Sequence, residues 1–258
     1  MRESRHQQVA SRIGTLLLVI LVLLLWELLA REKLIDLFFF SQPTAILNDL
    51  VKLFVSGEIW PHVLITLQET LMGLVIGTAV GIILAFVFGV FDFVARVLDP
   101  IVVALYGIPK LALAPMFILW FGLGVQAKIL MATLMVFFLA FFNAYAGFRS
   151  VEPSLINTVK LMGANRVQVM VKVVFPSCLP WIMAGLRAGL GAALLGAIAG
   201  EYLGARQGLG WMVVNAGAMY DITRVFSAVV VLVLIISTMN AGLKLLEKRV
   251  LRWRPSDR

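Results

Sequence analysis

A few polar side chains occur inside stretches that are otherwise apolar, and two of them are cations that would suit an anion. Lys110 lies between Pro109 and Pro115, and Arg187 lies a few residues into another apolar stretch. A charge inside a membrane is costly, so such residues often face a cavity or a partner. The alternatives are a packing kink with a solvated lysine at 110, and an arginine at 187 whose head extends to the interface.

Neutral polar residues could line the same path. Tyr106, Thr133 and Asn143 lie within apolar stretches, where hydrogen bonding between helices is the alternative use of such side chains. Glu27 and Glu69 are expected at the outer ends of membrane spans. The sequence therefore predicts no acidic residue deep in a span and no catalytic group there.

The chain lacks the residues of an ATPase or a metal site. No Gly-x-x-x-x-Gly-Lys-Ser/Thr loop occurs in it, and that loop is what cradles nucleotide phosphates. One cysteine, Cys178, excludes an internal disulfide and a multi-cysteine metal site. Two histidines, His6 and His62, disfavour a His-rich metal site. We therefore expect no enzyme activity, no metal and no cofactor in this chain.

The composition indicates an all-α membrane protein. The chain is 61% hydrophobic with a mean hydropathy of +0.98, more than a soluble domain could bury. The net charge of +8 does not predict a nucleic-acid partner, because the cations cluster at the ends of apolar runs. Runs of about 20 apolar residues predict a bundle of six transmembrane helices. These are Ile13–Ala30, Thr70–Phe91, Ile101–Gly122, Ile129–Phe148, Trp181–Gly200 and Val225–Leu243.

The distribution of cations predicts the orientation. Most of the 22 lysines and arginines fall in segments that share a side with the N-terminus. Cytoplasmic segments carry the excess of such residues, so both termini are predicted to be cytoplasmic. We expect three regions: an N-terminal tail, first span and outer connection (1–64), a core (65–248) and a basic tail (249–258). The outer connection should hold an amphipathic helix at residues 43–54, with Ser41 or Thr44 near its start. That helix lies on the membrane surface or packs over the bundle.

A polar, basic segment at residues 149–180 separates the fourth and fifth spans. Pro153 suits the first turn of a helix, Gly163 suits a left-handed helix end, and Asn165 suits the cap of a second helix that stops before Pro176. The pattern predicts two short hinged helices that contact a partner, or that rest on lipid. The residues assigned to the partner contact are Glu152, Ser154, Leu155, Asn157, Thr158, Lys160, Leu161, Gly163, Ala164, Asn165, Arg166 and Pro176.

This segment resembles the signature of ATP-binding-cassette (ABC) importer permeases, which is roughly Glu-Ala-Ala, three residues, Gly, nine residues, then Ile-x-Leu-Pro. Gly163 is followed by nine residues and then Val173-Val174-Phe175-Pro176. The sequence departs from the signature where Asn157-Thr158-Val159 replaces Glu-Ala-Ala. The glycine, the proline and their spacing are kept.

Three further stretches, at residues 107–124, 201–216 and 245–255, look like the nitrate, sulfonate, taurine and bicarbonate branch of these permeases. The resemblance implies a type I importer permease in the bacterial inner membrane, with two copies of the chain forming the pathway. It implies two separate ATPase subunits that hold ATP and Mg²⁺, and a periplasmic or lipid-anchored binding protein. The solute would be a small anion such as a sulfonate, taurine or nitrate.

One alternative remains a stand-alone secondary transporter driven by an ion gradient, a class that usually has more spans and intramembrane acids. The other alternative is an intramembrane enzyme, but the predicted spans contain no group of His, Asp and Glu residues that could catalyse a reaction.

Overall fold

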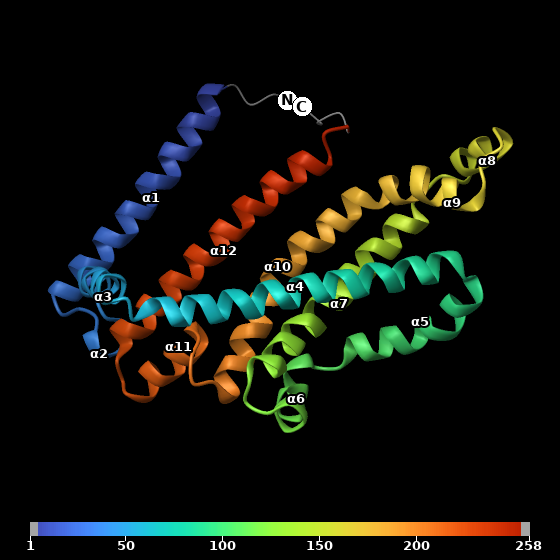
Figure 1. Ribbon diagram of the computed structural model, residues 1–258. Helices are drawn as coiled ribbons and strands as arrows, with labels where there is room; N and C mark the ends of the chain where they lie inside the picture. Colours follow the sequence, from blue (N-terminus) through green and yellow to red (C-terminus); the bar gives the residue numbers. More distant parts are fainter. Residues whose placement is uncertain (1–4, 254–258) are drawn as a thin grey trace.

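The computed structural model describes residues 5–253, with side chains from residue 13 onward, and the regular structure in this part of the chain is entirely helical (Figure 1). The elements are α1 (Arg5–Arg31), α2 (Leu37–Phe40), α3 (Pro43–Ser56), α4 (Ile59–Val90), α5 (Asp92–Gly107), the 3₁₀ turn η1 (Lys110–Leu113), α6 (Ala114–Phe121), α7 (Val125–Arg149), α8 (Pro153–Leu161), α9 (Arg166–Val169), the π-turn η2 (Met170–Val174), α10 (Phe175–Gly204), α11 (Leu209–Ala218) and α12 (Ile222–Val250).

Five helices are long and apolar enough to cross a membrane, and a bent pair makes a sixth candidate span. The bent pair corresponds to the predicted third span, which is therefore not a single straight helix. Its two halves, Asp92–Gly107 and Lys110–Phe121, meet at 85°. The break lies at Pro109, which has no N–H to donate, and Ile108 before it is extended (φ −67°, ψ 131°), as a residue preceding proline prefers.

α7 forms the centre of the bundle and packs along both α4 and α10. Glycines make the close approach possible. A Cβ at Gly77 would lie 2.6 Å from the carbonyl oxygen of Thr133, and one at Gly196 would lie 2.7 Å from the Cα of Ala132. Small residues at these positions let helices approach closely, and they do so here for α4 and α10 against α7.

α1 stands apart from this core and presents leucines on all sides. Its C-terminal end is tied to α3, because Glu27 accepts hydrogen bonds from the backbone N–H (3.1 Å) and the hydroxyl (3.0 Å) of Thr44. The helix predicted at residues 43–54 is present as α3. It starts at Pro43 after Gln42, with Ser41 and Thr44 near its start as expected. The boundary expected at 64/65 falls inside α4.

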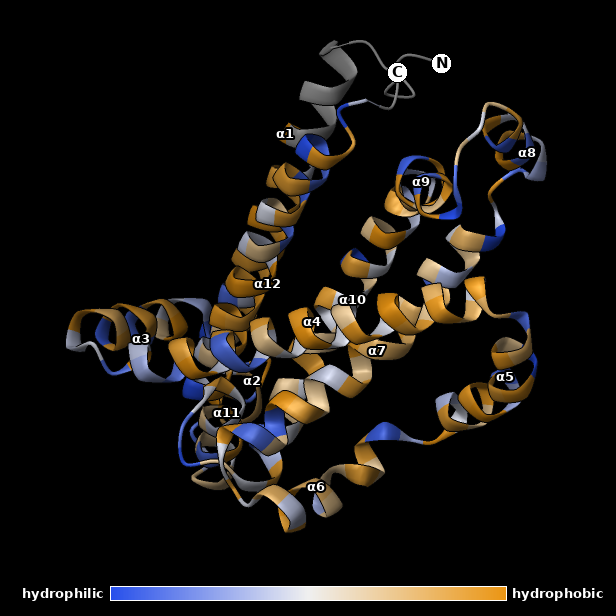
Figure 2. Ribbon diagram, turned by 45° about the vertical axis from the view of Figure 1, so that its right-hand side comes forward, coloured by the Kyte–Doolittle hydropathy of each residue, from blue (hydrophilic) through white to orange (hydrophobic). Residues whose placement is uncertain are grey.

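The start of α1, the end of α12, and α8 with α9 lie at one end of the molecule (Figures 1 and 2). Figure 2 shows apolar residues along the long helices α1, α10 and α12, with hydrophilic residues grouped toward the helix ends and loops. α2, α3 and α11 lie at the other end. The described ends of the chain thus share a side with the segment between α7 and α10.

Candidate functional site between α7 and α10

α8 has the start and the end that the sequence predicts. Pro153 occupies its first turn after Glu152, where a missing N–H leaves no hydrogen bond unmade. Gly163 has φ +88°, and the backbone N–H of Ala164 donates to the carbonyl of Val159 (3.2 Å). A left-handed glycine with such a bond closes a helix, so Gly163 forms the hinge.

Asn165 caps the next helix as predicted, and it does so in a reciprocal pair. Its Oδ1 accepts from the backbone N–H of Gln168 (2.8 Å), while Gln168 Oε1 accepts from the backbone N–H of Asn165 (2.9 Å). This is a capping box. Sequence reasoning missed Gln168, although its position three residues after the cap is the signal for it.

The second helix does not stop before Pro176, so that prediction is wrong. The chain from Arg166 to Gly204 is helical throughout and passes through the π-turn at Met170–Val174. Pro176 lies in the first turn of α10, directly after the π-turn, where the hydrogen-bond pattern shifts and absorbs the missing N–H. α9 is therefore the end of the long helix that contains α10, and a displacement of α9 would reach the core of the bundle directly.

One face of α8 is anchored and the other is open. Ile156 and Val159 pack with Phe148 and the buried Cys178. The side chains assigned to the partner contact are mostly exposed: Glu152, Ser154, Leu155, Asn157, Thr158, Lys160, Leu161, Gly163, Asn165 and Arg166, with Ala164 and Pro176 half-buried.

The tip of α8 exposes large apolar side chains. Leu161 is 90% exposed and Met162 is 81% exposed. Both lie outside the segments long and apolar enough to cross a membrane. Apolar residues clustered on an otherwise polar surface mark an interaction site. We refer to Leu161 and Met162 as the α8 tip.

The residues assigned to a translocation path do not form one cluster. Lys110 lies at the break between α5 and α6. Its Nζ donates a hydrogen bond to the backbone carbonyl of Tyr106 (2.6 Å) and lies 4.3 Å from the centroid of the Tyr106 ring. Asn143 donates to Leu139 in its own helix (2.8 Å), and the hydroxyl of Thr133 is buried without a partner. Arg187 pairs with Glu247 of α12. The structure thus brings together only Tyr106 and Lys110, and it gives Arg187 a structural ion pair.

A buried acidic cluster corrects one prediction. Glu69 of α4 and Glu201 of α10 are both fully buried, so Glu69 is enclosed by other helices and does not lie exposed at a membrane interface. Glu69 lies beyond the first turns of α4, which begins at Ile59. Among the described side chains, none donates a hydrogen bond to either carboxylate oxygen of Glu69, and Glu201 and Lys128 are near enough to act on it electrostatically.

Glu201 fastens the start of α11 to the core. Its Oε1 accepts from the hydroxyl of Thr66 (2.6 Å), and its Oε2 accepts from the backbone N–H of Gly210 (2.5 Å). The Thr66 hydroxyl in turn accepts from the backbone N–H of Leu209 (2.9 Å), and His62 Nδ1 lies 3.1 Å from the backbone of Gly208. The helical spacing of His62, Thr66 and Glu69 on one face of α4 is the signal that could have found this cluster.

Comparison with known proteins decides the class. Residues 77–252 match the family described as the binding-protein-dependent transport system inner membrane component. The chain belongs to this family of ABC importer permeases. It is a multi-pass inner membrane protein and a transport permease rather than an enzyme. Membership in this family decides against the stand-alone secondary transporter.

The permease has relatives with several named substrates. It is 32% identical to the taurine transport system permease protein TauC of Escherichia coli over 96% of this chain and 90% of that protein. It is 29% identical to the aliphatic sulfonates transport permease protein SsuC of Bacillus subtilis, over 93% and 87%. It is 32% identical to the riboflavin transport system permease protein RibX of Chloroflexus aurantiacus, over 95% and 91%.

A solved structure confirms the fold. A chain of the MetNI methionine ABC transporter matches with a TM-score of 0.61 at 24% identity, over 74% of this chain and 94% of that chain. The predicted all-α, type I importer permease fold is therefore confirmed.

Proposed function

We propose that two copies of this permease form the pathway of an ATP-driven importer, with two ATPase subunits docked on the α8 tip. The observation that carries the proposal is the exposed pair Leu161 and Met162, held on a short helix beside the end of a continuous helical span. A soluble binding protein, periplasmic or lipid-anchored, would deliver the solute at the opposite end. ATP and Mg²⁺ would be held by the ATPase subunits, and α8 with the termini would face the cytoplasm of a bacterial cell.

The connections of α8 support a mechanism of alternating access. α8 follows α7 directly, and α9 continues into α10, so both helices that meet in the core are attached to the docking segment. Closure of the ATPase pair around ATP would displace α8 and tilt α7 against α10. ATP binds the ATPase pair more strongly in its closed form and so favours the state of the permease that goes with closure, and hydrolysis restores the other state.

The solute we propose is a small anion of the sulfonate or taurine kind. The names of TauC and SsuC support this class, and Lys110 with Tyr106 supplies a cation and an aromatic ring at the break in a span. Nitrate is a further member of the same chemical class. The riboflavin relative means that uptake of labelled taurine must be compared with uptake of labelled riboflavin.

Gly163→Val should uncouple the ATPase subunits. Gly163 has φ +88° with nothing within 4 Å of an added Cβ, so the substitution strains the hinge by about 1–2 kcal/mol without creating a clash. We expect several-fold less ATPase copurification and ATP-driven uptake at equal expression. The wild-type complex should contain two copies of each subunit.

Gly57→Val is the matched control, because Gly57 also has a positive φ (+78°) and open space, but lies between α3 and α4 at the other end. A substitution at Gly210 would be an unsuitable control, because a Cβ there would lie 2.7 Å from Glu201 Oε2 and would create a clash. Wild-type copurification and uptake in Gly163→Val, or equal losses in both variants, would remove the coupling role of the hinge.

Cysteine labelling should fix the orientation. Leu34 and Leu161 lie at opposite ends of the molecule and are well exposed, whereas the native Cys178 is fully buried. An impermeant maleimide should label Leu34→Cys in sealed cells and Leu161→Cys only after permeabilisation. The reverse pattern would contradict a cytoplasmic α8.

A further inference from the structure

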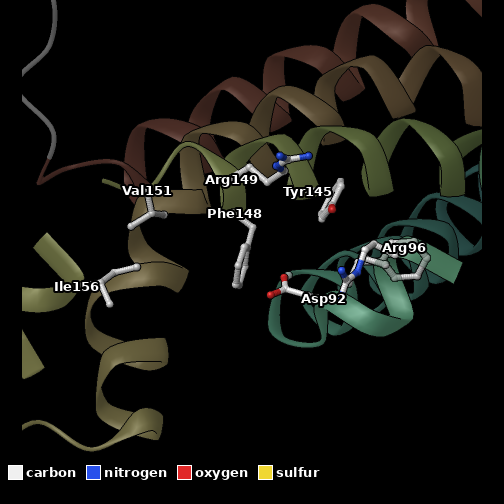
Figure 3. A pocket seen from close by; sticks show the side chains of 10 residues that line it. Asp92, Arg96, Tyr145, Phe148, Arg149, Val151 and Ile156 are labelled. Atoms are coloured by element: carbon white, nitrogen blue, oxygen red, sulfur yellow. The ribbon is translucent and has the colours of Figure 1, made fainter. Parts of the chain in front are cut away.

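A cavity of about 490 Å³ opens at the end of the bundle that carries α8 (Figure 3). Its walls come from the turn between α4 and α5, the last turns of α7 and the start of α8. The proposed function uses none of its polar residues.

Positive charge prevails in this cavity. Arg96 from α5 and Arg149 from the end of α7 line it, together with one carboxylate, Asp92. Figure 3 shows Asp92 and Arg96 on α5, with Phe148 and Tyr145 of α7 across from them and Arg149 next to Tyr145. Neither arginine forms an ion pair within residues 5–253, and Arg149 lies 5.9 Å from the ring of Tyr145. Two guanidinium groups without a carboxylate partner suit a phosphate group.

Aromatic side chains form the floor of the cavity, and a glycine leaves the space that one of these rings occupies. Phe88 and Phe148 line it, and a Cβ at Gly89 would lie 2.5 Å from ring carbons of Phe148. α4 ends at Val90 and α7 ends at Arg149, so the cavity lies where two spans leave the apolar region.

An apolar stripe leads away from the cavity along α5. Phe93, Val97, Ile101 and Leu105 recur every four residues and are all exposed, so they share one face of the helix. A free anion would not contact this apolar stripe, whereas the acyl chain of a lipid would cover it.

We infer that this cavity binds the headgroup of an anionic phospholipid, with its phosphate between Arg96 and Arg149 and an acyl chain along the stripe on α5. Basic pockets between transmembrane helices are known sites for such headgroups. Val151 and Ile156 form the wall on the side of α8, so the position of α8 and occupancy of the site would influence each other. The lipid site itself does not rest on the proposed function.

Lipid binding to the purified full-length chain tests the inference and needs no ATPase subunit. Delipidated protein is titrated with phosphatidylglycerol and, separately, phosphatidylcholine, and bound lipid is counted by native mass spectrometry. We expect Arg96→Gln/Arg149→Gln to weaken phosphatidylglycerol binding about 10- to 30-fold, as the loss of two basic residues near the membrane surface implies. Arg96→Lys/Arg149→Lys should retain most of the binding.

Arg249→Gln/Arg252→Gln is the matched control, because it removes the same charge from exposed arginines at the end of α12. Equal loss in this control, or no loss in Arg96→Gln/Arg149→Gln, would overturn the site. Competition by inorganic phosphate or glycerol 3-phosphate at the affinity of the lipid would also overturn it, in favour of a free anion. An unchanged thermal midpoint in each variant shows that folding is not the cause.

Discussion

Replacing Leu161 and Met162 by aspartate is expected to release the ATPase subunits from the permease. Both side chains are almost fully exposed in the single chain, so the substitutions should leave its fold unchanged. Burial of one such side chain in an interface contributes about 1.5–3 kcal/mol, and an unpaired buried carboxylate opposes binding further. We therefore expect the affinity for the ATPase to fall by a factor of about 100 or more, measured by copurification and by titration of ATPase onto immobilised permease.

A pair of the same residue types supplies the control at the other end of the molecule. Leu34 and Met219 are 72% and 71% exposed. Leu34→Asp/Met219→Asp adds the same two charges and should leave ATPase affinity at the wild-type level. Equal losses in both double variants, or no loss at the α8 tip, would contradict the proposed docking surface.

The spans could be predicted because each is a long apolar run, a property of the local sequence. The bend in the third span could not be predicted in full. Pro109 and Pro115 indicate that the helix of the third span is interrupted. The 85° angle between the two halves of that span depends on how α6 packs against α7, and a local sequence pattern does not predict this packing.

The break between α8 and α9 was also predictable from local signals. Pro153, Gly163 and Asn165 each act within one helical turn, and the structure confirms all three. The continuity of α9 with α10 was missed because Pro176 reads as a stop. A π-turn before it removes the conflict, and a π-turn has no strong sequence signature.

The acidic cluster was missed because its partners are distant in sequence. Thr66 and Glu201 lie on different spans, and Gly210 follows on the next helix. The spacing of His62, Thr66 and Glu69 indicates a shared polar face on one helix, but it does not indicate which other elements enclose that face. Glu69 was therefore predicted to lie at the nearest expected span end.

Glu201→Ala is expected to lower the stability of the protein by several kcal/mol. The substitution would leave the buried hydroxyl of Thr66 and the backbone N–H of Gly210 without their acceptor. An orphaned buried donor costs about 1–3 kcal/mol, so we expect the free energy of unfolding to fall by about 2–6 kcal/mol. Thermal unfolding of the detergent-solubilised protein measures this, and an unchanged midpoint would contradict the contact.

Glycine substitutions in α11 test the same contact from its other side. A Cβ at Gly210 would lie 2.7 Å from Glu201 Oε2 and 3.0 Å from the carbonyl of Ile198, so Gly210→Ala should destabilise the protein by about 1–3 kcal/mol. Gly217, in the same helix, has nothing within 4 Å, and Gly217→Ala should be neutral or stabilising by up to about 1 kcal/mol.

The double variant Glu201→Ala/Gly210→Ala separates a clash with this carboxylate from a general effect on the helix. The shorter side chain at 201 removes the atom that the new methyl group would meet, so the double variant should lose less stability than the sum of the single losses. Additive losses would mean that another contact, such as the carbonyl of Ile198 at 3.0 Å from the added Cβ, and not Glu201, opposes a side chain at position 210.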